Sequence, residues 1–306
     1  MMGTKVLNIL KSSLVSLLVL VFVPSTNAQS QPVEDFDILS EPVNLVLKNG
    51  RSLRGQAMDI ENNSLVFEGA SGAGEVEYTF SHEEISRLDF PGNELAVKAN
   101  SYLNNGDPDS ALPILDALYR QRVRFFRFMP PNEVAFFQKL SDTAYRTGDY
   151  YLAVGVARNV RPYVENPIIK RQLDDRELLA HYHLPLLEKT QSLADSWIAE
   201  WEPYSASALG WYVLGQLAFD REEFDNALWL SLKPVVFSSQ FPMEYLDHCY
   251  ALAIVAAVKI EDYTEAQRLL DEMQRRRMSW PTAPKLEPYL DYFDSIPEPK
   301  TESAKG

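Results

Sequence analysis

The sequence predicts a mainly α-helical protein in which a small five-stranded β-barrel module precedes an α-helical solenoid. Residues 42–92 consist of short alternating apolar runs separated by turn residues, a pattern typical of strands. From residue 93 the apolar period changes from two to helical. Small residues then recur at similar positions, at Ala111, Ala153, Ala194, Ala227 and Ala266. Because a single helical hairpin cannot bury its own apolar face, this recurrence predicts several stacked hairpins.

The N-terminus predicts export. Lys5 and Lys11 are accompanied by an apolar run over 12–24, and the small residues of 25–28 offer a cleavage site. This order of charge, apolar core and small-residue exit is typical of a cleavable signal peptide, here residues 1–28. The run is short for a membrane span, so an uncleaved anchor helix is only the alternative. We expect a periplasmic or secreted protein whose mature chain has no integral membrane span.

The mature chain is predicted to be strongly acidic. The whole chain carries a net charge of −14, and removal of residues 1–28 takes away two lysines and no acidic residue, leaving about −16. Affinity for nucleic acid depends on neutralising phosphates, so this charge argues against a nucleic-acid partner. The single cysteine, Cys249, cannot form an internal disulfide. A chain of this length buries enough apolar surface to fold without one.

Changes in composition divide the chain into parts. Residues 29–41 are polar and predict a loose linker before the β module of 42–92. Helical repeats are expected over 93–294 and a disordered tail over 295–306. Within the β module, strands are expected at 43–47, 52–60, 64–68, 75–80 and 85–90. Gly55 interrupts the second strand and predicts a bend or bulge there.

The β module resembles a known class of small barrel. Its pattern Leu47-x-x-Gly50-x-x-x-x-Gly55, with Asp59 and Asn63 further on, is similar to the first motif of Sm-like and SH3-like barrels. Sm-like proteins bind RNA, but this segment holds four basic residues against eight acidic ones, so RNA binding is not expected. The interpretation that we favour for this segment is a capping or docking module beside the helices.

The helical part resembles the tetratricopeptide-repeat (TPR) proteins. The pattern W-x-x-L-G-x-x-A that begins at Trp211, followed by Ala227 and Leu228, is similar to one TPR repeat. Three further segments, around Ala99, Ala144 and Ala253, align to this repeat. A weaker helical pair is expected around Ala194. Pro185 falls inside the expected first helix of the weaker pair. The resemblance implies a superhelix whose first helices line a concave, partner-binding surface.

By the family's pattern, that surface takes polar and aromatic residues from the first helices. These residues are Asn100, Asn104, Asp142, Tyr145, Arg146, Tyr212, Gln216 and Phe219. The alternative is that many of them pack between hairpins. A separate basic patch is predicted where Arg120, Arg124 and Arg127 fall at i, i+4 and i+7 on one helical stripe. Such a patch suits an acidic protein segment or a polyanion, and the alternative is a solvated stripe.

Residues suited to catalysis or metal binding do not form a recognised pattern. His181 and His183 follow Glu177, but one carboxylate and one imidazole on a helical face are too few for a zinc site. His248 and Cys249 are sequence neighbours, which do not face each other on a helix, so a buried thiol is expected rather than a nucleophile. The sequence has no nucleophile elbow, phosphate-binding loop or metalloprotease motif. We therefore expect no enzyme activity, no cofactor and no metal.

The leading hypothesis is a non-catalytic protein–protein interaction scaffold of the bacterial cell envelope. It would bind a peptide or an envelope protein in the concave groove of the TPR-like array. One alternative is a cell-wall glycan-binding protein or an envelope enzyme that uses carboxylates such as Asp174, Asp175 and Glu177 together with aromatic side chains. A third possibility is a self-associating envelope component.

Overall fold

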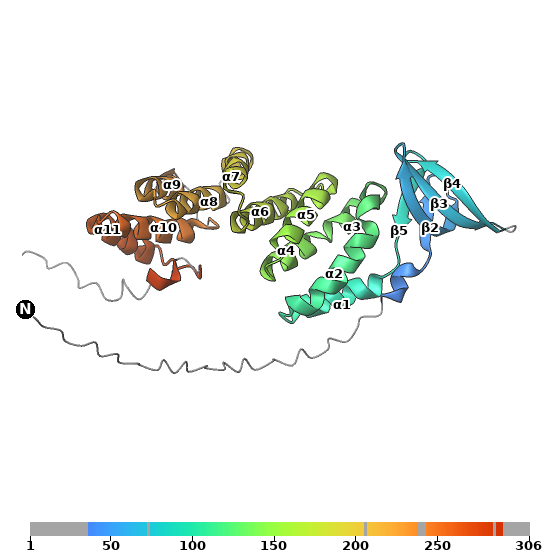
Figure 1. Cartoon of the computed structure of the whole chain (residues 1–306), viewed down its shortest axis with the longest axis horizontal. Helices are drawn as coiled ribbons and strands as arrows, with labels where there is room; N and C mark the ends of the chain where they lie inside the picture. Colours follow the sequence, from blue (N-terminus) through green and yellow to red (C-terminus); the bar gives the residue numbers. More distant parts are fainter. Residues whose placement is uncertain (1–35, 72–73, 205–206, 238–242, 284–285, 290–306) are drawn as a thin grey trace, which may run out of the picture. The chain divides into compact units, whose positions relative to one another are not determined.

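The computed structural model describes residues 36–71, 74–204, 207–237, 243–283 and 286–289. The predicted signal peptide, most of the predicted linker and the predicted tail lie outside these residues. In the described part, a five-stranded sheet is followed by helices that pair in consecutive hairpins, which confirms the predicted fold class (Figure 1). Among the described helices, none combines the length and the hydropathy that a membrane crossing requires.

The β module is an antiparallel sheet whose strands lie close to the predicted positions. The strands are β1 (Val43–Leu47), β2 (Ser52–Glu61), β3 (Ser64–Ser71), β4 (Gly74–Ser81) and β5 (Ile85–Asp89). Their order is β4-β3-β2-β1-β5, so the last strand returns to pair with the first. Barrel closure would require β4 to pair with β5. In the described ladder these two strands stand at opposite edges, so the five-stranded sheet is confirmed and closure into a barrel stays a prediction.

Gly55 lets β2 and β3 approach each other. Residue 55 pairs with Gly69, and a Cβ at this position would lie 1.9 Å from the carbonyl oxygen of Glu68. Any side chain here would therefore push the two strands apart. The bulge that the sequence predicts at this glycine lies slightly further on, where the β2–β3 register shifts between Ala57 and Asp59.

Across the described part of the helical region, the helices form five hairpins, with short helices between some of them. The paired helices are α1 (Asn93–Asn104) with α2 (Pro108–Arg122), α4 (Gln138–Arg146) with α5 (Tyr150–Val160), α6 (Pro167–His183) with α7 (Leu187–Trp201), α8 (Leu209–Asp220) with α9 (Phe224–Phe237), and α10 (Leu246–Lys259) with α11 (Tyr263–Arg275). The second helices of three hairpins begin after an aspartate whose side chain accepts a backbone N–H at 3.0 Å, at Asp107, Asp149 and Asp262. These caps satisfy amide groups that the first helical turn leaves unpaired.

Small residues allow the helices to pack closely, as the repeat pattern predicts. All five recurring alanines are at most 2% exposed, namely Ala111, Ala153, Ala194, Ala227 and Ala266. At Gly215 in α8, a Cβ would lie 2.6 Å from the Ser231 hydroxyl and 2.9 Å from a methyl group of Leu252. The glycine of the repeat motif therefore marks the point where α8 meets both α9 and α10.

The weaker hairpin is present as α6 and α7, with its turn in a different place from the expected one. Pro185 lies between the two helices and not inside the first. A proline is well tolerated there because the residue lies outside the helical hydrogen-bond ladder. The long spacing from Ala111 to Ala153 has a separate cause, since η2 (Val123–Phe128) and α3 (Pro131–Ala135) are inserted between the first two hairpins.

The described end of the predicted linker is packed and not loose. Asp37–Ser40 forms a short 3-10 helix, η1, and the side chains of Phe36, Ile38 and Leu39 lie against the main core. The Gln121 side chain donates a hydrogen bond to the Leu39 carbonyl oxygen at 2.6 Å. These three apolar residues within four positions explain why the segment leaves solvent.

The sheet and the first hairpins share one hydrophobic core. Side chains of β1 and β3, such as Leu45 and Phe67, belong to the same buried cluster as Ile114 of α2 and Phe126 of η2. Arg122, only 5% exposed, donates to the Pro91 carbonyl oxygen at 2.6 Å. Burial lowers the pKa of this arginine to about 10.

Candidate partner-binding groove

The first helices of successive hairpins, with the segment that follows α11, surround a hollow of about 580 Å³. Four tyrosines, two histidines and four other residues line it: Tyr145, Tyr182, Tyr212, Tyr245, His183, His248, Leu179, Gln216, Thr282 and Ala283. They come from α4, α6, α8, the start of α10 and the chain after α11. We call this hollow the tyrosine groove. Its lining has aromatic faces and hydroxyl groups but no Asp, Glu, Lys or Arg side chain.

The rings of the tyrosine groove are held by contacts with one another. Tyr212 and Tyr245 stack with centroids 6.0 Å apart, and His248 meets Tyr212 edge-on at 5.1 Å. At the other side, the His183 ring stacks on Tyr150 at 4.5 Å and lies 5.8 Å from the Tyr145 ring. Aromatic pairs at such separations are mutually stabilising, so the lining is ordered before any ligand binds.

Hydrogen bonds join the tyrosine hydroxyls to the one amide side chain of the groove. The Tyr182 hydroxyl lies 3.1 Å from both Oε1 of Gln216 and Oδ2 of Asp220, and Gln216 Nε2 donates to the Tyr212 hydroxyl at 3.3 Å. Burial raises the pKa of Tyr182 and of Tyr212 well above the ordinary value. These hydroxyls therefore remain protonated and act as neutral hydrogen-bonding groups.

Tyr245 has an unusual backbone conformation in the middle of the site. Its φ is +61°, in the left-handed region that non-glycine residues seldom adopt, and it forms the N-cap of α10. Its ring borders the tyrosine groove and two adjoining hollows. Burial raises the pKa of Tyr245 to about 12. Strained residues of this kind cluster at functional sites, where the surrounding structure holds them in place.

One of the adjoining hollows, of about 450 Å³, is polar and is lined by three acidic and two basic side chains. Arg176 is paired with Asp142 at 2.7 Å, and Arg171 with Glu244 at 2.8 Å. The fifth charged group is Asp175, which accepts a hydrogen bond from the Trp197 indole at 2.8 Å. Burial raises the pKa of the Asp175 carboxyl to about 6.

The structure brings only some of the predicted binding residues together. Tyr145, Tyr212 and Gln216 line the tyrosine groove, and Asp142 lines the polar hollow beside it. The other four predicted residues line neither hollow: Asn100, Asn104, Arg146 and Phe219. Among these, Asn100 accepts a hydrogen bond from Lys139, and the Phe219 ring packs edge-on against Phe224 within its own hairpin.

Four of the six aromatic residues in the lining were not predicted from the sequence. Tyr182 and His183 lie at the end of α6, a helix whose repeat pattern is weak, although their position there matches that of Tyr145 at the end of α4. Tyr245 precedes α10 and His248 lies in its first turn, and the repeat pattern places no binding residue at these positions of a first helix. A run of aromatic residues at the ends of first helices was the available signal.

The predicted basic stripe does not form, because the α-helix stops inside it. Of the three arginines, Arg120 lies on α2, whereas Arg124 and Arg127 lie on the 3-10 helix η2. Because a 3-10 helix has fewer residues per turn than an α-helix, the i, i+4, i+7 alignment is lost. Arg124 donates to the Met58 carbonyl oxygen at 3.3 Å, and Arg127 donates to the Asn63 side chain. These two arginines attach η2 to the sheet.

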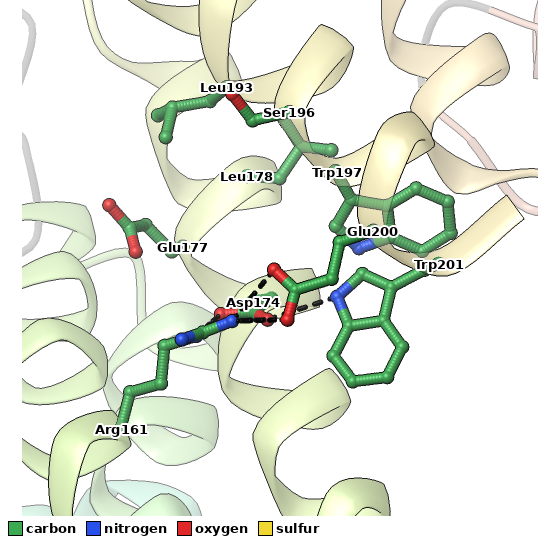
Figure 2. A pocket seen from close by; sticks show the side chains of 9 residues that line it. All are labelled: Arg161, Asp174, Glu177, Leu178, Leu193, Ser196, Trp197, Glu200 and Trp201. Atoms are coloured by element: carbon green, nitrogen blue, oxygen red, sulfur yellow. Dashed lines mark hydrogen bonds and ion pairs between the residues drawn. The ribbon is translucent and has the colours of Figure 1, made fainter.

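A smaller pocket of about 250 Å³ contains Asp174 and Glu177, two of the three carboxylates considered for glycan binding, whereas Asp175 lines the polar hollow (Figure 2). Figure 2 shows Arg161 between Asp174 and Glu200, with the Trp201 indole nitrogen pointing at Asp174. Arg161 Nη2 lies 3.0 Å from Asp174 Oδ2 and 2.7 Å from Glu200 Oε1. Glu177, on the other side of the pocket, pairs with Arg158 at 2.5 Å. These carboxylates are thus engaged in contacts that join α6 to α7 and to the end of α5.

The residues considered for nucleophilic or metal chemistry are not assembled into a site. Cys249 is fully buried, and burial raises the pKa of its thiol, which keeps it protonated. The His248 ring instead lies 2.8 Å from the Asp247 carboxylate. Over the described ranges, no three His, Cys, Asp or Glu side chains are close enough together to hold a metal ion.

Comparison with known proteins gives likenesses of fold. A scan against models of protein families finds no match, and a search of the curated proteins finds none either. Among solved structures, the chain is similar to the TPR-like repeats of a putative kinesin light chain from Podosopora anserina, with 16% identity, 60% of this chain and 93% of that chain covered, and a TM-score of 0.45. It is also similar to MamA 41-end from Desulfovibrio magneticus RS-1, with 18% identity, 61% and 97% covered, and a TM-score of 0.44.

Proposed function

We propose that this chain is a non-catalytic scaffold that binds a peptide segment of a partner protein in the tyrosine groove. The predicted signal peptide directs it to the bacterial cell envelope, where the partner would be an envelope protein. The observation that supports the proposal is the convergence of α4, α6, α8 and the start of α10 on one aromatic hollow. Tyr145, Tyr212 and Gln216, chosen from the repeat pattern, meet there.

The physical properties of the groove suit a peptide. Its volume of about 580 Å³ accommodates several side chains of an extended segment. The lining tyrosines offer apolar faces with polar tips, the combination that is enriched in protein interfaces. Because neighbouring rings already hold them, these side chains lose little conformational entropy when a ligand binds.

Site-specific photo-cross-linking in the native host cells tests this proposal. The full chain would carry a photoreactive phenylalanine derivative at residue 183, on the exposed rim of the groove, or at residue 229 as a matched control. His183 and Trp229 are both exposed, but Trp229 lies on α9, outside the groove lining. We expect defined adducts with one or two envelope proteins at 183 and none of these at 229.

A second variant separates groove occupancy from general stickiness. Thr282 is exposed and lines the groove, so Thr282→Trp fills part of the hollow without removing a buried side chain. We expect this change, combined with the photoreactive residue at 183, to abolish the adducts, whereas Thr282→Ser preserves them. Adducts that are equal at 183 and 229, or that persist in Thr282→Trp, would show that the groove is not the binding site.

A further inference from the structure

The tyrosine groove has three properties that together specify a class of ligand, and the inference drawn from them rests on the function proposed above. We infer that the groove selects an uncharged, proline-rich segment of the partner protein. The three properties are the absence of charged side chains from the lining, the hydrogen bonds that already join Gln216 and three of the tyrosine hydroxyls to neighbouring side chains, and the proline-containing segment of this chain that already forms one wall.

The charge argument concerns the lining. None of its ten residues is Asp, Glu, Lys or Arg, although 24% of the chain is charged. Charged side chains do touch the lining from outside, but they are already engaged there: Asp220 with the Tyr182 hydroxyl, Asp247 with the His248 ring, and Arg176 with Asp142. A charged ligand side chain entering the hollow would therefore lose hydration without gaining an opposite charge from the lining itself, which is unfavourable. Charged residues gather in the polar hollow next to it, and there Arg171 and Arg176 are already paired with carboxylates. The tyrosine groove therefore favours an uncharged ligand.

The hydrogen-bond argument concerns the ligand backbone. Gln216 is bonded to the hydroxyls of Tyr182 and Tyr212, and the Tyr145 hydroxyl lies 3.4 Å from Nε2 of His183. An ordinary peptide brings one backbone N–H per residue that needs an acceptor. Proline has no N–H, so a proline-rich segment enters such a lining with fewer unsatisfied donors. Proline-rich segments also adopt an extended helix before binding and dock in grooves lined by aromatic rings.

The chain itself provides an example of a proline-containing segment at this site. Among the described residues between α11 and η5 (Glu287–Tyr289), none belongs to a helix or strand, and Pro281 within this segment is buried. Thr282 and Ala283 form one wall of the groove, and Leu286 is fully buried in the cluster that also contains Tyr212. The rings therefore already pack against irregular, proline-containing chain on one side, and the open volume lies beside it.

Calorimetric titration of the full chain tests the inference. The probe is acetylated and amidated decaproline, and the matched control is an acetylated and amidated decapeptide of alternating glycine and serine, which is uncharged and flexible. We expect saturable binding of decaproline and at least tenfold weaker binding of the control. Thr282→Trp and Tyr245→Ala should each weaken decaproline binding at least tenfold, while Trp229→Ala leaves it unchanged.

The outcomes distinguish failure of this inference from failure of the proposed function. Decaproline binding that is absent, or that Thr282→Trp and Tyr245→Ala do not weaken, overturns the inference. If adducts at residue 183 still depend on an open groove, the scaffold function stands with a different class of peptide. If those adducts are absent as well, both ideas fail. Circular dichroism melting of each variant verifies that a loss of binding does not reflect unfolding.

Discussion

The rings of Tyr212 and Tyr245 stack with their planes 26° apart, although Tyr212 lies inside α8 and Tyr245 precedes α10. The stack therefore joins two hairpins at the groove. The two residues are held differently, because Tyr212 is 8% exposed in a helix whereas Tyr245 has a left-handed backbone. This difference allows the effect of losing each ring on folding to be predicted.

Tyr245→Gly should destabilise the protein less than Tyr212→Ala. Glycine relieves the left-handed strain, worth about 1–3 kcal/mol, and thereby offsets part of the lost ring packing. Tyr212→Ala removes a buried ring without such compensation and should lower the free energy of unfolding by about 3 kcal/mol. Urea unfolding followed by tryptophan fluorescence measures both values. An equal or larger loss for Tyr245→Gly would contradict the assignment of strain.

Gly215→Ala should destabilise the chain by about 1–3 kcal/mol, because the added methyl group would overlap Ser231 and Leu252. Gly155→Ala is the matched control. Gly155 also lies inside a helix, α5, but nothing lies within 4 Å of a Cβ built there. The control should be neutral or stabilising by about 0.5–1 kcal/mol through helix propensity. Thermal unfolding of the two variants measures the difference in stability. Equal melting temperatures would show that the helices can separate at Gly215 without cost.

Asp175→Asn should stabilise the protein near pH 7.5. The folded-state pKa of Asp175 is raised to about 6, so the folded protein binds a proton more readily than the unfolded chain does. The stability linked to this group is present at low pH and is lost as the pH rises through about 6. Asparagine keeps an acceptor for Trp197 without the charge, and the gain should be about 2 kcal/mol at pH 7.5 and vanish near pH 4. Urea unfolding at both pH values is the measurement. A stability difference between variant and parent that is the same at both pH values would contradict the raised pKa of Asp175.

His181 should give the opposite pH dependence. Burial, and secondarily the nearby Arg158, lower the pKa of His181 to about 4, so the unfolded chain binds the proton first as the pH falls below about 6.5. The associated stability is thus lost between about pH 6.5 and pH 4. His181→Gln can still accept the Arg158 hydrogen bond and should reduce this acid sensitivity. Urea unfolding of the parent and of His181→Gln at several pH values between about 6.5 and 4 measures this difference. Equal acid sensitivity of the two proteins would contradict the assignment.

Arg161→Ala should be more harmful than Glu200→Ala. Loss of Arg161 removes the ion pair of the mostly buried Asp174 carboxylate and leaves the Trp201 hydrogen bond, and we expect a cost of about 1–3 kcal/mol. Glu200 is 51% exposed, so removing it should cost about 0–1 kcal/mol. Chemical denaturation distinguishes the two values. If the two variants are equally stable, Asp174 does not depend on the arginine.

The sequence predicted the elements better than it predicted the groove, for a physical reason. Strand alternation, aspartate caps and recurring small residues are local signals, and the strands and hairpins lie where these signals occur. The groove depends on which side chains from distant segments meet. Tyr145 and Tyr212 were accessible through the repeat pattern, but Tyr245 was not, because its position depends on a left-handed turn before α10.

The errors also have local causes. The basic stripe was wrong because the helical period changes at Val123, which composition does not reveal. The linker was expected to be loose although Ile38 and Leu39 were visible in it, since their docking surface is built by α2, far along the chain. Pro185 was placed inside a helix because the weak repeat gave no sharp turn signal.

The lack of charged side chains in the groove lining has a consequence for the environment in which the protein works. Dissolved ions screen attraction between charges on a protein and its ligand, and the effect grows with ionic strength. A groove that relies on aromatic packing would keep its affinity when the surrounding salt concentration changes. Such a groove would suit the proposed envelope location, because an envelope compartment exchanges small ions with the outside medium.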